Sequence, residues 1–305
     1  MSATDAQAPS YRGRFAPSPT GPLHFGSLVA AVGSFLDARH RGGTWLVRVE
    51  DLDPPRTVPA AADDILRTLE AFGMHWDGEV IYQSNRADVY EHMLERLRRM
   101  DVVYPCACSR REIADSALPG SDGPVYPGTC RAGIGEGRTA RAWRVRVDDA
   151  AIHFNDRVQG TIASRLATEV GDFVVRRGDG LFAYQLAVVV DDAEQGITDV
   201  VRGADLLGST ARQIQLQRLL DLPTPEYLHL PVAVNARGEK LSKQVGAAAV
   251  NPARAISLLY DALAFLGQAP PRELHHTDLG SVWGWAVANW DVGKVPKKTA
   301  IIAEV

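Results

Sequence analysis

The sequence lacks the features of a membrane or secreted protein. No apolar run approaches the roughly 18 residues that a membrane-spanning helix needs. Residues 1–10 are rich in Ala, Ser and Pro and contain no apolar core, so they do not form a signal peptide, and we expect a flexible tail there. Cysteine is scarce, with three residues among 305, and an odd number argues against a disulfide framework. These absences predict a cytoplasmic protein that makes no membrane contact.

A strong positive charge is also missing. The formal net charge is −4, so any contact with RNA has to come from local clusters of basic residues. The chain is 46% apolar and 23% charged, which is ordinary for a globular protein long enough for about two domains. Because no apolar helix face stands out, we expect a monomer.

Strand and helix patterns alternate in two parts of the chain. Residues 11–15 and 44–50 are strand-like, and the helical stretches 28–41 and 59–72 follow them. The same alternation returns later, with strands at 173–177 and 197–202 and helices at 182–191 and 209–220. Such βα alternation is typical of a parallel sheet covered by helices.

The segment between these two parts has a different texture. After a predicted helix at 85–100, residues 101–171 contain the cysteines, Pro/Gly turns and an extended stretch at 142–147. The sequence therefore predicts an α/β fold, a Rossmann-type parallel sheet split by an α+β insert. We assign residues 11–75 and 173–247 to the two halves of the catalytic domain, 76–172 to the insert, and 248–305 to a short helical segment with helices at 252–266 and 281–290.

The first motif runs from Arg14 to Ser27. Its prolines stiffen a loop between a strand and a helix, and Gly21 and Gly26 permit tight turns. His24 is then expected at or near the helix N-terminus, where unpaired N–H groups attract anions and an imidazole can donate to a phosphate oxygen. Taken alone, the stretch fits a Pro/Gly loop with a capping histidine at least as well.

The second motif is Lys240-Leu241-Ser242-Lys243-Gln244. A turn containing Gly238 precedes it, so two ammonium groups lie on a hinged loop that can close over a triphosphate. A tetrapeptide of this kind is usually an ordinary surface loop. It indicates triphosphate binding here because it lies downstream of the first motif.

Together the two motifs resemble those of the class I aminoacyl-tRNA synthetases of the glutamyl branch, with a HIGH-type and a KMSKS-type motif. The fourth position of the first motif is Ser27 instead of His, a change that glutamyl-type relatives often share. The resemblance implies that His24 and Lys243 are catalytic and that ATP binds with Mg²⁺ to Arg14, Phe15, Ala16, Pro17, Ser18, His24, Gly26, Lys240 and Lys243.

The resemblance also implies a pocket for L-glutamate. Arg14 and Arg202 are the candidate partners of the side-chain carboxylate, since a guanidinium fork matches a carboxylate. Glu50 is the candidate partner of the α-amine, and Tyr184 adds a hydrogen bond. From the residues alone, surface salt bridges explain these charges as well.

The cysteines form one cluster in the sequence, Cys106-Ala107-Cys108 followed by Cys130. Zinc usually takes four ligands, so three thiolates need a fourth partner, and three free thiols in a reducing cytosol are the alternative. Some glutamyl-type synthetases have C-x-C followed by Y-x-x-x-C in this insert, and by that resemblance Tyr126 is the fourth ligand of one structural zinc ion.

Only about 55 residues follow the second motif, too few for the long helical anticodon-binding region of a glutamyl-tRNA synthetase. In this respect the chain resembles the glutamyl-queuosine tRNA(Asp) synthetases. That family implies activation of glutamate by ATP without tRNA, then transfer to the queuosine base in the anticodon of tRNA(Asp). The alternatives are a truncated glutamyl-tRNA synthetase that charges a tRNA 3′ end, a non-catalytic RNA-binding relative, and a generic nucleotidyltransferase of the same superfamily.

Overall fold

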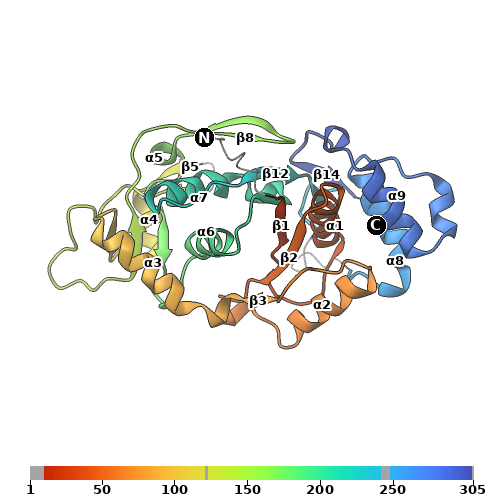
Figure 1. Ribbon diagram of the computed structural model, residues 1–305. Helices are drawn as coiled ribbons and strands as arrows, with labels where there is room; N and C mark the ends of the chain where they lie inside the picture. The colour runs from red at the N-terminus through yellow and green to blue at the C-terminus, as the bar shows by residue number, and fades with distance from the viewer. Residues whose placement is uncertain (1–9, 121–122, 242–247, 304–305) are drawn as a thin grey trace, which may run out of the picture.

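The computed structural model describes residues 10–120, 123–241 and 248–303. Most of the expected tail at residues 1–10 lies outside these ranges, as do Ser242, Lys243 and Gln244 of the second motif. The described chain is elongated, with the insert at one end and the C-terminal helices at the other (Figure 1).

The first half of the central sheet is parallel. Strands β1 (Arg12–Phe15), β2 (Thr44–Val49) and β3 (Ile81–Tyr82) lie in that order, with Arg12 opposite Thr44. Helix α1 (Phe25–His40) connects β1 to β2, and α2 (Ala61–Ala71) lies between β2 and β3. Gly42, at φ +63°, turns the chain after α1.

The second half repeats the pattern. Helix α6 (Tyr184–Glu194) leads to β11 (Asp199–Gly203), and α7 (Leu207–Leu219) leads to the parallel neighbour β12 (Glu226–Leu230). The N–H of Thr198, just before β11, donates to the carbonyl of Arg12 at 2.9 Å. The two halves therefore adjoin at β1 and β11, and the predicted α/β fold with parallel strands is confirmed.

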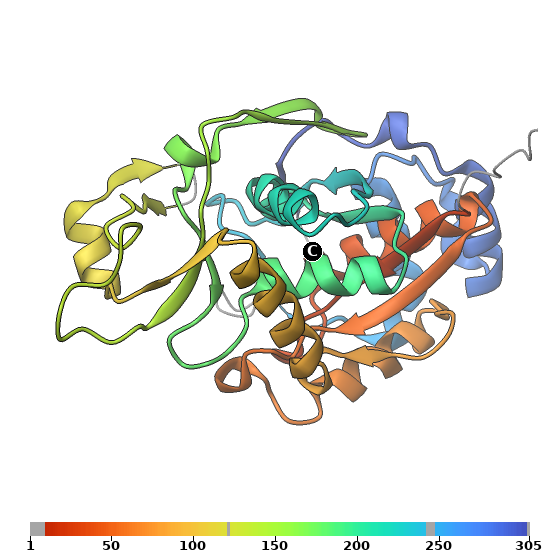
Figure 2. The ribbon, with the colours of Figure 1, turned by 60° about the vertical axis from the view of Figure 1, so that its left-hand side comes forward.

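A hairpin extends the second half at its edge. Strands β8 (Ile152–Asp156) and β9 (Gly160–Ser164) are antiparallel, and Asp156 of β8 pairs with Tyr227 of β12. The hairpin runs along the top of the molecule from the insert toward the C-terminal segment (Figure 2). The sequence analysis did not predict that this part of the insert region would join the catalytic sheet.

The insert contains a small antiparallel sheet in the order β10-β7-β4. Its strands are β4 (Val103–Cys106), β7 (Ala142–Val145) and β10 (Val174–Arg176), and the helices α3 (Ala87–Arg99), α4 (Arg110–Ser116) and α5 (Leu166–Glu169) lie in the same region, with a hairpin of β5 (Leu118–Gly120) and β6 (Gly123–Val125). The expectation that residues 173–177 begin the second half of the parallel sheet is wrong, because β10 pairs antiparallel with β7.

The C-terminal segment packs on α1. Its helices are α8 (Ala255–Phe265) and α9 (Leu279–Asn289). Phe25 meets Phe265 edge to face, Phe35 packs on Trp283, and Trp283 donates to the carbonyl of Phe72 at 2.7 Å. Near the end of the described chain, β14 (Ala300–Ile302) pairs in parallel with β13 (Val232–Val234). No helix among the described residues is long and apolar enough to cross a membrane.

Candidate active site

The loop of the first motif connects β1 to α1 and is fixed from both sides. The N–H of Glu50 donates to the carbonyl of Pro17, and that of Val58 donates to the carbonyl of Pro19, both at 2.9 Å. His24 is the N-cap residue of α1, as the motif predicts. The loop therefore presents the N-terminal end of a buried helix to the space above the sheet.

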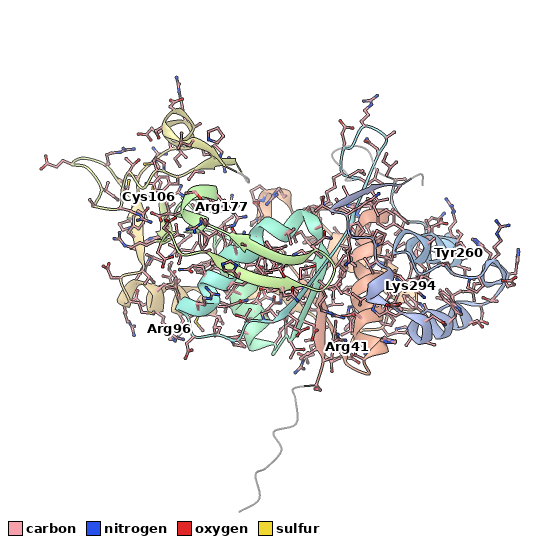
Figure 3. All side chains as sticks on the ribbon, turned by 90° about the horizontal axis from the view of Figure 1, so that it is seen from above. Arg41, Arg96, Cys106, Arg177, Tyr260 and Lys294 are labelled. Carbon is pink, nitrogen blue, oxygen red and sulfur yellow. The ribbon has the colours of Figure 1, made fainter. Side chains whose placement is uncertain are left out.

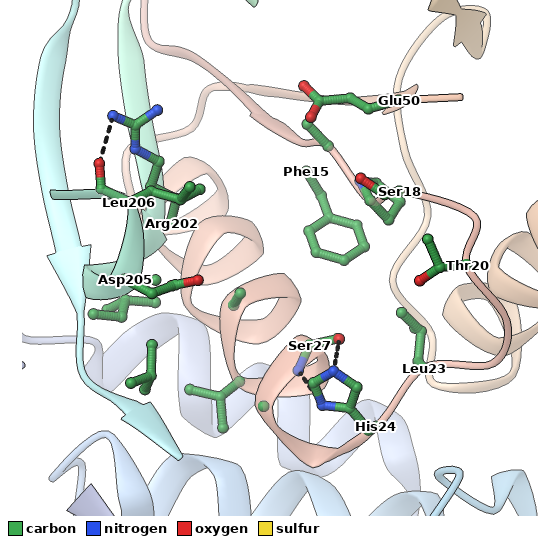
Figure 4. Close-up of a pocket in the computed structure, with 18 of the residues that line it drawn as sticks. Phe15, Ser18, Thr20, Leu23, His24, Ser27, Glu50, Arg202, Asp205 and Leu206 are labelled. Carbon is green, nitrogen blue, oxygen red and sulfur yellow. Dashed lines mark hydrogen bonds between the residues drawn. The ribbon is translucent and has the colours of Figure 1, made fainter. Parts of the chain in front are cut away.

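The His24 ring contacts Ser27 with both nitrogens. The N–H of Ser27 donates to Nδ1 at 3.3 Å, and the Ser27 hydroxyl lies 3.0 Å from Nε2 (Figure 4). Because Nδ1 accepts, a neutral imidazole carries its proton on Nε2. Ser27, which departs from the HIGH pattern, thus holds the ring in a state that can donate a hydrogen bond.

A cavity of about 870 Å³ lies beside this loop, at the carboxyl ends of β1 and β11. Open α/β sheets bind their ligands at this edge. The cavity brings together the described members of the predicted ATP and glutamate sets: Arg14, Phe15, Ala16, Pro17, Ser18, His24, Gly26, Glu50, Tyr184, Arg202 and Lys240. Figure 4 shows Glu50 and Arg202 on opposite sides of it, with His24 at one end.

Arg14 is buried at 3% exposure and is held by Asp192 of α6. Its Nε and Nη2 donate to the two carboxylate oxygens at 3.0 and 3.3 Å. Burial opposes ionisation of Asp192, but Arg14 and Arg48 outweigh it and hold its pKa below the ordinary value. The Arg14 guanidinium is therefore a fixed cation in the wall of the cavity.

Arg48, near the carboxyl end of β2, contacts both Asp192 and Glu50. It is fully buried and contacts Asp192 at 2.8 Å and Glu50 at 3.2 Å. Burial raises the pKa of Glu50, and the charges of Arg48 and Arg14 oppose that rise. The cavity thus contains a desolvated carboxyl group whose protonation depends on its neighbours, a common property of binding sites for charged groups.

Arg202 of β11 is 5% exposed. Its Nε contacts His229 Nε2 at 3.0 Å, and its Nη2 donates to the Thr210 hydroxyl at 2.9 Å. Tyr184 Oη lies 3.5 Å from Nη1, and burial raises the pKa of this phenol. The site therefore has two buried guanidinium groups near a phenol, a donor set suited to a carboxylate ligand.

The start of the second motif also reaches the cavity. Lys240 forms an ion pair with Asp205 at 2.5 Å, and the N–H of Leu241 donates to the carbonyl of Ala233 at 2.9 Å. On the far side of residues 242–247, Ala249 forms a β-bridge with His24. The described ends of the lysine loop thus lie beside the first motif, while the predicted catalytic Lys243 lies outside the described residues.

The three cysteines and Tyr126 converge in the insert, at the end of the molecule opposite Tyr260 (Figure 3). Tyr126 Oη lies 3.3 Å from Cys106 Sγ and 3.6 Å from Cys108 Sγ, and the Cys108 and Cys130 sulfurs are 3.6 Å apart. The three sulfur atoms lie within 4.8 Å of one another. Three thiols and a phenol oxygen around one point are a donor set that suits zinc.

Sequence reasoning missed the residues that hold the site residues in place. Arg48, Asp192 and His229 lie within apolar strands or helices, and each pairs with a residue distant in the chain. A charge inside a predicted buried element was the available signal, since such a charge needs a partner. The sequence could not identify that partner.

Comparisons with known proteins identify relatives of this chain. Residues 10–258 match the family model of the class I tRNA synthetases (E and Q), catalytic domain. The chain is 62% identical to a Glutamyl-Q tRNA(Asp) synthetase of Aromatoleum aromaticum, over 96% of this chain and 93% of that protein. It is 61% identical to one of Dechloromonas aromatica, over 96% of this chain and 98% of that protein.

Two solved structures have a fold similar to that of this chain. A glutamate tRNA ligase from Elizabethkingia meningosepticum superposes with a TM-score of 0.77 at 25% identity. The match covers 95% of this chain but 66% of the longer ligase. A methionyl-tRNA synthetase from Mycobacterium tuberculosis, at 16% identity and a TM-score of 0.53, shares the fold alone.

Proposed function

The chain belongs to the Glutamyl-Q tRNA(Asp) synthetases, and on that basis we propose that it activates L-glutamate with ATP and transfers it to the queuosine base of tRNA(Asp). The observation that supports this most is that one cavity is lined by the loop of the first motif, two buried arginines and the carboxyl group of Glu50, whose side chain is 9% exposed. The amino acid and the triphosphate can then react without an enzyme nucleophile, so catalysis depends on positioning and on charge neutralisation.

The amino acid is proposed to lie between Arg202 and Glu50. Arg202 and Arg14 attract the side-chain carboxylate, Tyr184 donates a hydrogen bond, and Glu50 pairs with the α-ammonium group. This arrangement leaves the α-carboxylate unpaired, so it can act as the nucleophile. A neutral glutamine side chain interacts less favourably with the two guanidinium groups of Arg14 and Arg202, so the pocket favours glutamate.

ATP is proposed to lie along the first motif, from Phe15 to Gly26. The α-carboxylate attacks the α-phosphorus in line, a new P–O bond forms, and the bond to the pyrophosphate oxygen breaks. His24 donates from Nε2 to a phosphate oxygen in place of the Ser27 hydroxyl that lies against it, and Lys240 and Lys243 neutralise the departing pyrophosphate. Mg²⁺ bound with ATP would neutralise part of the negative charge of the phosphates.

In the second step, a hydroxyl group of the queuosine cyclopentenediol attacks the carbonyl carbon of glutamyl-adenylate. The new ester bond forms, the mixed anhydride bond breaks, and AMP leaves with the hydroxyl proton passing to solvent or to the leaving phosphate. The modified base reaches the cavity by turning out of the anticodon loop, as unpaired RNA bases commonly do.

The insert is proposed to hold one structural zinc ion through Cys106, Cys108, Cys130 and Tyr126. The convergence of their four side-chain atoms supports this assignment. The ion would join the end of β4 to the loops around Tyr126 and Cys130, which have little apolar core of their own. We assign it a role in shaping the insert and no chemical step.

The test is glutamate-dependent exchange of radiolabelled pyrophosphate into ATP with no RNA present. We expect exchange with L-glutamate and little with L-glutamine or L-aspartate. A chain that needs tRNA(Glu) for exchange would instead be a glutamyl-tRNA synthetase, and a chain with no exchange would be a non-catalytic relative.

A further inference from the structure

The guanidinium group of Arg202 is aligned by a histidine that does not line the cavity. His229 is fully buried on β12, directly opposite Arg202 of β11 in the parallel register. Its Nε2 lies 3.0 Å from Arg202 Nε. The Nε of an arginine carries a hydrogen and cannot accept, so His229 Nε2 has to be the acceptor and cannot carry a proton.

The other ring nitrogen faces a buried carboxylate. His229 Nδ1 lies 2.6 Å from Oδ2 of Asp156, which is also fully buried. Oδ1 of Asp156 accepts the N–H groups of Val158 and Gln159 at 3.0 and 2.8 Å. Since a carboxylate cannot donate, Nδ1 has to carry the proton, and one tautomer of neutral His229 satisfies both of its neighbours.

The electrostatics favour the same state. Burial and the charge of Arg202 lower the pKa of His229 to about 4, although Asp156 opposes the change. A protonated ring would place an N–H against the N–H of Arg202. The neutral ring instead completes a chain of hydrogen bonds from Asp156 through His229 to Arg202.

Arg202 is then restrained on its remaining side. Its Nη2 donates to Thr210 at 2.9 Å and lies 3.5 Å from the carbonyl oxygen of Leu206. With Nε and Nη2 both occupied, rotation of the guanidinium plane would break at least one hydrogen bond. The fixed plane directs the remaining donor atoms toward the side of the cavity where Tyr184 lies.

We propose that Asp156 and His229 are positioning residues that set the tautomer of one ring and thereby lock the Arg202 guanidinium for the side-chain carboxylate of the amino acid. This inference rests on the proposed function, in which Arg202 binds glutamate. It also gives a role to the β8–β9 hairpin, which carries Asp156 from the insert region to the edge of the catalytic sheet.

A purely structural role for the pair predicts loss of stability without a selective effect on glutamate. Asp156→Asn separates the two roles because it keeps the shape and removes the charge. Its Oδ1 can still accept the N–H groups of Val158 and Gln159, so its amide NH₂ faces His229 Nδ1. We expect the ring to switch to the Nε2–H tautomer, which sets two donors against each other at Arg202.

A matched pair of variants at position 229 tests the acceptor directly. His229→Leu and His229→Gln both remove the ring that pairs with Asp156, so they share that loss of stability. Only the glutamine places an amide oxygen close to the position of Nε2, where it can accept from Arg202. A difference between the two in glutamate affinity therefore reports the alignment of Arg202.

The experiment combines pyrophosphate exchange on the full chain with ¹⁵N NMR of its histidine side chains. We expect at least a tenfold rise in the glutamate KM for Asp156→Asn and His229→Leu, a rise under threefold for His229→Gln, and an ATP KM within twofold of the unaltered chain in all three. The ¹⁵N signals should show Nδ1–H in the unaltered chain and Nε2–H in Asp156→Asn.

Two results are to be distinguished. An unaltered chain with no glutamate-dependent exchange contradicts the proposed function itself. If exchange in the unaltered chain is normal, two outcomes overturn the positioning role alone. One is an unchanged glutamate KM in Asp156→Asn and His229→Leu. The other is an equal rise of the glutamate KM and the ATP KM in these variants. His229 in the Nε2–H form in the unaltered chain also overturns it.

Discussion

The guanidinium group of Arg202 is fixed in orientation at the wall of the cavity, so its proposed role depends on its shape as well as its charge. His229 and Thr210 engage two of its three nitrogens, and its side chain is almost fully buried. A flexible cation in the same place would lose these hydrogen bonds and would have to be ordered again by each ligand. The planar fork is already ordered, which reduces the entropic cost of binding.

Arg202→Lys tests this at the level of one residue. It keeps the positive charge and removes the Nε–H and Nη2–H donors, so we expect the glutamate KM to rise at least tenfold, equivalent to about 1.4 kcal/mol. The ATP KM should change little, and steady-state pyrophosphate exchange measures both. Arg67→Lys, the same change at an exposed position of α2, is the control. An equal effect on both substrates would contradict a specific role toward glutamate.

Glu50 gives a prediction about pH. Burial raises the pKa of its carboxyl group, and only the ionised form can pair with an ammonium group. The glutamate KM should therefore rise as the pH falls through that raised pKa, above the range where an exposed glutamate would be protonated. Glu50→Gln should show a high KM with little dependence on pH over the same range. If the glutamate KM of Glu50→Gln rises in the same way as the pH falls, the Glu50 carboxyl group is not the cause of that rise.

The sequence predicted the residues that line the cavity better than those that hold them. Arg14, Glu50, Tyr184 and Arg202 were identified through a family resemblance and not through spacing. The pairing of Arg14 with Asp192 and the pairing of His229 with Asp156 could not be predicted, because hydrogen bonds between distant elements leave no local pattern. Their roles in binding glutamate stay predictions until the kinetic measurements are made.

At the level of elements, the alternating strands and helices of the catalytic sheet were predicted because their apolar patterns are local. Strand β10 was expected at about the right residues but in the wrong sheet, since the partner of a strand is set by the folded chain. For the same reason β8 and β14, which join distant strands, were not predicted as parts of those sheets.

The cysteine cluster makes a prediction about the insert. Cys130→Ser replaces one proposed ligand, so we expect bound zinc to fall from about one ion per chain to near zero and the thermal unfolding temperature to drop. Because the four ligands come together only in the folded chain, metal binding adds to folding stability, which is the reason for the second effect. Metal analysis and calorimetry on the purified chain measure the two quantities.

Ser109→Ala is the matched control in the same region. Ser109 caps α4 by accepting from the N–H of Glu112 and lies one residue from Cys108. Loss of such a cap typically costs about 1 kcal/mol, and we expect zinc to be retained. Full zinc content in Cys130→Ser, or none in the unaltered chain, would argue against the proposed site.

At the level of the whole molecule, buried charges tie the parts together. Asp37 of α1 accepts from Tyr11 before β1, from Arg157 in the turn after β8, and from Trp290 after α9. Burial opposes its ionisation, yet Arg157 keeps its pKa below the ordinary value of 3.8. Its stabilising contribution is present above that ordinary value and is lost as the pH falls below it.

His229 should make stability depend on pH in a higher range. Its pKa falls from 6.5 to about 4 on folding, so between these values the unfolded chain binds the proton and the folded chain does not. Acidification from pH 7 to 4 should therefore cost up to about 3 kcal/mol through this residue. Urea unfolding at several pH values should show a smaller loss over this range in His229→Gln, and no such difference in His153→Gln on the exposed side of β8. An equal loss of unfolding free energy in the unaltered chain and in both variants would contradict this contribution of His229.

The central claim is that one cavity first joins glutamate to AMP and then delivers it to a modified base. The most direct measurement is transfer of radiolabelled glutamate, in the presence of ATP, to tRNA purified from cells that make queuosine and from cells that do not. We predict labelled tRNA(Asp) from the first source and no label on any tRNA from the second. Equal labelling of both preparations, or labelling of tRNA(Glu), would contradict the proposed acceptor.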